Sequence, residues 1–156
     1  MCAQDALEWL SEITTRRTAF IGLGNRDRGD DAVGLRFIDE LKHLNPGYFF
    51  SEEEGLESII LRIIKDEGVD NVIFVDSCDF GSKPGEVSFF KSDDIGESIS
   101  AHKVPLSMLM ALIQKEGKNS HLVAIQPKSL DLMANLSNEV ERSLDILEKQ
   151  LNDLLG

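Results

Sequence analysis

Cysteines and basic residues are scarce in this sequence, and each shortage excludes a class of protein. The 156 residues include two cysteines, Cys2 and Cys78, which form neither a disulfide framework nor a CxxC metal site. Lys and Arg total 16 against 28 for Asp and Glu, and the formal net charge is −12. Because phosphate groups attract cations, this balance argues against a surface for nucleic acid or for an anionic membrane.

Long apolar runs are missing as well. No stretch approaches the roughly 20 apolar residues that span a membrane. Residues 1–17 carry charges where a signal peptide has its apolar segment. A chain of 156 residues suits one domain with a sizeable core. We therefore expect a monomeric cytoplasmic protein that binds neither nucleic acid nor a membrane.

Short apolar runs alternate along the chain with stretches of helical periodicity. The short runs predict strands at 18–23, 48–52, 71–76, 86–90 and 121–126. Apolar residues at helical spacing predict helices at 33–44, 56–64, 105–113 and 140–154, with a weaker pattern at 6–13. Ser137 is the predicted N-cap of the last helix.

Strands that alternate with helices are typical of a mainly parallel sheet. The run VIFV at 72–75 is apolar at every residue, as in a central strand covered on both faces. The pair Pro84-Gly85 predicts a turn into an antiparallel or edge strand. The predicted fold class is α/β: a single domain with a mainly parallel twisted sheet of about five strands and helices on both faces. Residues 1–16 are predicted to be a helical extension, and residues 17–156 the domain.

Polar residues lie at three places where this fold binds ligands, which is beyond the carboxyl ends of its strands. Asp30 and Asp31 lie in the turn GNRDRGDDAVG. The dipole of a following helix stabilises an acid there by about 0.3–1 kcal/mol, which accounts for Asp30 and leaves Asp31 for a function. Asp76 ends the apolar strand NVIFV, and His102 lies where a loop enters a helix.

Asp31, Asp76 and His102 together offer two carboxylates and an imidazole. That is the ligand set of an open metal site, with positions left for water or a substrate. Each residue also has a structural explanation, because a solvated strand end accommodates an aspartate and a lone histidine is usually a surface or capping residue. Cys78 without a partner cysteine is expected to be a small buried hydrophobe rather than a ligand or nucleophile.

A nucleotide site is a further possibility that the sequence argues against. Gly22 and Gly24 follow a predicted strand, but the third glycine of a GxGxxG motif would fall on Asp27. Two aspartates at the start of the next helix would also repel a pyrophosphate.

Four motifs carry a resemblance to a known family. The strings GLGNRDRGDDAVG, VIFVDSC with PGEV after it, SAHKVPLSMLM and VAIQPKSLDLMANLSNEV occur in the order and spacing of the hydrogenase maturation endopeptidases, and the chain resembles that family from about residue 18 to residue 151. These proteases remove a C-terminal extension from the large-subunit precursor of nickel-iron hydrogenases once nickel has been inserted.

The resemblance implies an α/β fold, and it implies that Asp31, Asp76 and His102 contact the metal and serve catalysis. It further implies that the metal is the nickel of the substrate, that the partner is the large-subunit precursor, and that no organic cofactor is needed. Asp30 would then cap and orient the turn that carries Asp31.

The chain departs from the family pattern in two places. Some family members have Glu where this chain has Asp31, and a glycine-rich turn after the second strand is reduced here to EEEGLES, in which only Gly55 remains. The alternative hypothesis is a non-catalytic nickel- or precursor-binding chaperone of hydrogenase maturation, because no serine–histidine or cysteine–histidine motif is evident in the sequence.

Overall fold

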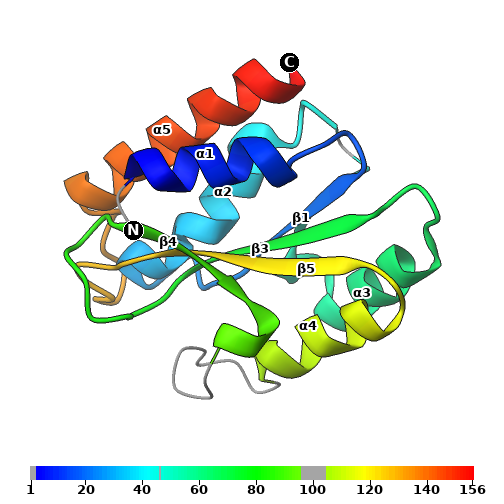
Figure 1. Cartoon of the computed structure of the whole chain (residues 1–156). Coiled ribbons are helices and arrows are strands. Elements are labelled where there is room, and N and C mark those ends of the chain that lie inside the picture. Colours follow the sequence, from blue (N-terminus) through cyan, green and yellow to red (C-terminus); the bar gives the residue numbers. More distant parts are fainter. Residues whose placement is uncertain (1–2, 46, 96–104) are drawn as a thin grey trace.

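Five strands form one sheet, with helices above and below it (Figure 1). The computed structural model of the chain describes residues 3–45, 47–95 and 105–156. The strands are β1 (Thr18–Gly22), β2 (Phe49–Ser51), β3 (Asn71–Ser77), β4 (Val87–Lys91) and β5 (Asn119–Ile125). The helices are α1 (Ala3–Ile13), α2 (Val33–Leu41), α3 (Leu56–Lys65), α4 (Leu106–Lys115) and α5 (Asn138–Leu155). No helix in these three ranges combines the length and apolarity needed to cross a membrane.

The order of the strands creates a switch point between β1 and β3. The order across the sheet is β2-β1-β3-β5-β4, with β1, β2, β3 and β5 parallel. After β1 the chain moves outward to β2 and then returns to the other side of β1, where it forms β3. Ligands in such sheets bind outside the carboxyl ends of the strands at that reversal. The edge strand β4 runs antiparallel to β5, as the Pro84-Gly85 turn predicts.

Alternation along the strands divides the core into two apolar layers. Phe20, Val75 and Val123 point to one face, where α1, α2 and α5 cover the sheet. Ile21, Phe74 and Leu122 point to the other face, toward α3 and α4. Both sets are almost fully buried, which is why the central strands read as continuous apolar runs. Figure 1 shows the two helical layers on either side of the sheet.

The N-terminal helix α1 packs onto the sheet and onto α5. Trp9 stacks on Phe89 of β4, with 3.8 Å between the ring centroids, and meets the ring of His121 edge-on. Leu10 is buried in the same apolar layer as α2 and α5. The helix predicted at 6–13 is therefore confirmed, while the division of the chain after residue 16 stays a prediction.

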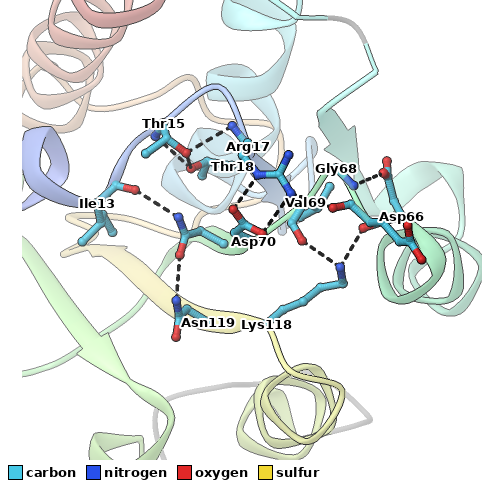
Figure 2. Close-up of polar contacts among 12 residues, drawn as sticks. Ile13, Thr15, Arg17, Thr18, Asp66, Gly68, Val69, Asp70, Lys118 and Asn119 are labelled. Carbon is cyan, nitrogen blue, oxygen red and sulfur yellow. Dashed lines mark hydrogen bonds and ion pairs between the residues drawn. The ribbon is translucent and has the colours of Figure 1, made fainter.

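Polar side chains at the amino ends of the strands bind one another (Figure 2). The buried Lys118, just before β5, donates from Nζ to the carbonyl oxygens of Asp66 and Val69, both at 2.7 Å. Arg17, just before β1, pairs with Asp70 at 2.5 Å. These contacts tie the loops that enter β1, β3 and β5 together. The polar groups at this end of the sheet thus serve the fold.

Candidate active site at the carboxyl edge of the sheet

The two predicted site aspartates lie at the carboxyl ends of neighbouring strands, Asp31 in the segment after β1 and Asp76 near the end of β3. The register pairs Gly22 with Val75, so the turn after β1 begins beside Asp76, the next residue of β3. That turn leads into the short 3-10 helix η1 (Gly29–Ala32), which carries Asp31, and directly into α2. Asp31 and Asp76 therefore lie at the same edge of the sheet, at its switch point, as the sequence predicts.

Gly24 makes the close approach between the two strand ends possible. Its φ is +137°, and a methyl group on its α-carbon would lie 1.9 Å from the carbonyl oxygen of Asp31 and 3.9 Å from Oδ1 of Asp76. Its N–H donates to Oε1 of Glu52, the residue after β2, at 2.5 Å. Only glycine fits this position, because other residues disfavour the backbone angle and no side chain has room.

The carboxylates of Asp31 and Asp76 differ in exposure. Asp31 is partly exposed, and its Oδ1 accepts a hydrogen bond of 2.8 Å from the hydroxyl of Ser77. Asp76 is only 4% exposed at the end of an apolar strand. Burying a carboxylate is unfavourable unless other groups compensate. The Oδ1 of Asp76 lies beside Gly24, in the turn that leads to Asp31. The hydroxyl of Ser77 orients Asp31 from the residue next to Asp76.

The prediction for Asp30 is half right, because Asp30 orients the turn that carries Asp31 but does not cap it. It does not cap its own helix, because the N-cap of η1 is Arg28 and that helix has no side-chain cap. Asp30 is fully buried and accepts four hydrogen bonds, from the amides of Lys128, Ser129 and Ser137 and from the hydroxyl of Ser137. Ser137 is the N-cap of α5, so Asp30 joins the first motif to the last one.

The loop at 126–137, hereafter the β5–α5 loop, is bonded to the turn that carries Asp31. In Figure 1 it is the orange segment that leaves the sheet at the same end as the green loop after β3. At its start the buried Gln126 accepts from the amides of Phe80 and Ser82 and donates to Asp79 at 3.0 Å. Gln126 lies in the QP motif that contributed to the resemblance, but nothing else in the sequence marks it as a site residue.

Cys78 follows Asp76 but is not a nucleophile in this setting. Its side chain is 3% exposed. Burial, together with the negative charges of Asp76 and Asp31, raises the pKa of the Cys78 thiol well above its usual range. The thiolate is the reactive form of cysteine, so this thiol stays protonated and inert at neutral pH. The prediction that Cys78 is a buried hydrophobe is confirmed.

Of the three predicted metal contacts, the structure brings two together. His102 lies outside the described residues. Within the described part of the chain, no group of three or more His, Cys, Asp or Glu side chains is arranged to hold a metal ion. His121 does not replace His102, because it pairs with Ile73 in the register of the sheet, three residues before Asp76, and contacts Trp9. The complete three-residue site stays a prediction.

Carboxylates lie at the switch point of a mainly parallel sheet, beside a cysteine that stays protonated. Such groups suit acid–base or metal-assisted chemistry rather than thiolate chemistry. Comparison with known proteins identifies the family. The model of the HycI hydrogenase maturation protease family matches residues 57–153. Hydrogenase 3 maturation protease of Escherichia coli K12 is 22% identical over 138 residues, which cover 86% of this chain and 88% of that protein.

Two further relatives extend the match. Protein FrxA of Pyrococcus furiosus is 34% identical over 126 residues, which cover 74% of this chain and 88% of that protein. The crystal structure of a NiFe hydrogenase maturation protease HycI from Thermococcus kodakarensis superposes with a TM-score of 0.80 at 27% identity, covering 94% of this chain and 98% of that one. The chain belongs to the HycI family of hydrogenase maturation proteases, which are endopeptidases.

Proposed function

We propose that this protein removes the C-terminal extension of a nickel-iron hydrogenase large-subunit precursor after nickel has been inserted, and that it recognises the nickel through Asp31, Asp76 and His102. The observation that carries the proposal is that Asp31, in the segment after β1, and Asp76, at the end of β3, lie at the same edge of the sheet, at its switch point. The family to which the chain belongs processes the hydrogenase large subunit. The carboxyl edge of a mainly parallel sheet is where such a fold binds its ligands.

The nickel in this proposal belongs to the substrate. A precursor without nickel offers nothing for the carboxylates and the imidazole to bind, so the protease binds the nickel-loaded form better. Differential binding of this kind acts as a checkpoint on maturation. Imidazole and carboxylate are both suitable ligands for nickel.

Hydrolysis also requires an activated water. A metal would activate water and polarise a carbonyl by Lewis acidity, whereas a carboxylate activates water only, by taking its proton as a general base. Asp76 is our candidate for the base. Its burial suits that task, because a base works best when bulk water does not compete for the proton. Asp31, which is held by Ser77, is then the more accessible of the two metal contacts.

Intact mass spectrometry of the precursor tests the proposal directly. The large-subunit precursor of the same organism, with and without nickel, is incubated with the protein. We expect the loss of one C-terminal peptide from the nickel-loaded form only. An unchanged mass, with the two proteins co-eluting, would instead support the alternative of a nickel- or precursor-binding chaperone.

Substitutions then assign the residues. Asp31→Asn, Asp76→Asn and His102→Ala should each slow peptide release by about 100-fold or more, since a positioned acid or base contributes roughly 10²–10⁴-fold. Asp145→Asn is the control, because Asp145 is exposed on α5 and should leave the rate unchanged. Normal processing by any one of the three variants would remove that residue from the mechanism.

A further inference from the structure

The β5–α5 loop exposes apolar side chains beside the candidate active site. Leu130, Leu132 and Met133 are 41%, 75% and 74% exposed, and we call these three residues the apolar tip. Single exposed apolar residues are common on protein surfaces. Three within four consecutive positions, on a loop tied to the site, are more informative.

The backbone of the apolar tip is held in a conformation that its sequence disfavours. Met133 has a φ of +62°, the only positive φ at a non-glycine residue in the described part of the chain. A bulky residue in this region is an outlier, and such strain persists only where the surroundings enforce it, often at sites that bind ligands. A glycine or asparagine would fit this backbone more easily, so the chain keeps a methionine here at a cost in strain.

The turn that carries the site aspartates holds the loop in place. The amide of Met133 donates to the carbonyl oxygen of Asp27 at 2.6 Å. The amide of Asp30 donates to the carbonyl oxygen of Ser129 at 2.9 Å, and the carboxylate of Asp30 accepts from the amides of Lys128 and Ser129. The apolar tip is therefore attached on both sides to the segment that ends in Asp31.

We propose that the apolar tip is the docking surface for the apolar side chains of the precursor that flank the bond to be cut. The inference rests on the proposed function, because it takes the substrate at Asp31 and Asp76 to be a polypeptide. A polypeptide held at those carboxylates passes over the loop that is bonded to the same turn. Because the loop is already ordered, binding loses little conformational entropy on the side of the protease.

The ligand of the apolar tip is the precursor, because the loop that carries the tip is bonded to the turn that ends in Asp31. Met133 supplies a flexible and polarisable apolar contact, and Leu132 adds a second apolar side chain beside it. The tip is an exposed apolar patch on an acidic protein, and burial of its apolar area favours an apolar segment of the precursor.

Kinetics of precursor cleavage test the inference. The double variant Leu132→Ser, Met133→Ser should raise KM for the nickel-loaded precursor by about 10- to 100-fold, since full burial of one such side chain accounts for roughly that factor. The turnover number kcat should stay within about threefold. Leu61→Ser is the matched control, because Leu61 is 57% exposed on α3, and it should change neither constant.

Met133→Gly separates docking from folding. Glycine relieves the unfavourable φ, so the thermal stability should stay equal or rise, whereas KM should still increase. A KM that is unchanged in both the double variant and Met133→Gly overturns the inference while leaving the proposed function intact. The same holds if the double variant dissociates a dimer of this chain without a change in KM, because the tip would then bind a second copy.

Failure of the proposed function gives a different result. If the wild-type protein binds the nickel-loaded precursor without cutting it, the proposed protease activity is wrong and the docking surface is tested by Kd, which the double variant should raise by the same factor. If the wild-type protein neither cuts nor binds the precursor, both proposals fall together.

Discussion

The carboxylate of Asp30 accepts two hydrogen bonds from Ser137, one from its amide at 2.7 Å and one from its hydroxyl at 2.9 Å. The two residues are 107 positions apart in the chain. Ser137 also caps α5 by accepting from the amide of Val140. One buried carboxylate therefore fixes the start of α5, the β5–α5 loop and the turn that precedes Asp31. The position of the candidate site depends on this link between the first and the last motif.

Asp30 and Ser137 should be energetically coupled. Asp30→Asn replaces an acceptor of four hydrogen bonds by an amide whose NH₂ faces donors, so we expect a loss of about 2–4 kcal/mol in the free energy of unfolding. Ser137→Ala should lose about 1–2 kcal/mol as a cap. Urea denaturation of the two single variants and the double variant should give a coupling energy of about 1–3 kcal/mol. Asp30→Asn combined with Ser143→Ala is the control, because Ser143 donates to Gly85 and Glu139 instead, and those effects should add.

Local patterns were sufficient to predict the elements of the fold. The apolar runs that predict β3 and β5 are buried on both faces, so their composition carries the signal of a central strand. The helical stripes predict α2, α3, α4 and α5 within a few residues. The position of Asp31 and Asp76 at one edge also follows from the sequence, because parallel strands bring their carboxyl ends together.

Contacts between distant segments could not be predicted in the same way. The bonds from Asp30 to Lys128 and Ser129 join residues 98 and 99 positions apart and leave no periodic pattern in the sequence. The local sequence explains Asp30 by the dipole of the helix that follows it. In the structure, Asp30 instead accepts hydrogen bonds from the distant segment at 128–137. The strained φ of Met133 has the same origin, since the loop is fixed by its partners rather than by its own residues.

Gly24→Ala should disrupt the site. The new methyl group would lie 1.9 Å from the carbonyl oxygen of Asp31, at a φ of +137°, so the turn must move. We expect a loss of more than about 3 kcal/mol, above the roughly 1–3 kcal/mol of backbone strain alone, and a large drop in precursor cleavage. Gly117→Ala is the control, because Gly117 has a φ of +88° with open space around it. It should show the strain alone and keep full activity. If Gly24→Ala and Gly117→Ala lost the same stability in thermal denaturation, the contact with the carbonyl oxygen of Asp31 would not be the cause of the loss.

Cys78 should make stability fall at alkaline pH. The folded state holds the thiol protonated because burial and the carboxylates of Asp76 and Asp31 raise its pKa, whereas an unfolded thiol loses its proton near pH 8.5. Above that pH the unfolded state binds fewer protons, so the free energy of unfolding decreases as the pH rises. The measurement compares the free energy of unfolding of two proteins in a Cys2→Ser background, one with Cys78 and one with Cys78→Ala. Between pH 9.5 and 11, the free energy of unfolding of the protein with Cys78 should fall relative to that of Cys78→Ala by up to about 1.4 kcal/mol per pH unit.

The same Cys78→Ala variant separates stability from catalysis. It leaves a small cavity, so its free energy of unfolding at pH 7 should be somewhat lower. Cleavage of the nickel-loaded precursor at a temperature where the variant is folded should continue at a rate within about threefold of the parent. A loss of all cleavage in this variant would mean that the thiol takes part in the reaction.

Lys118→Met should lower stability and leave processing intact, because Lys118 lies at the end of the sheet opposite to the candidate site. Its Nζ satisfies the carbonyl oxygens of Asp66 and Val69 (Figure 2), and hydrogen bonds from a charged donor contribute about 1.5–3 kcal/mol each. We expect the free energy of unfolding to fall by about 2–4 kcal/mol in urea, while kcat/KM of the folded variant stays unchanged. Lys115→Met on the exposed end of α4 should change the free energy of unfolding by less than about 0.5 kcal/mol. A fall in kcat/KM for Lys118→Met would show instead that the two ends of the sheet are coupled, and the amino end would then belong to the functional unit.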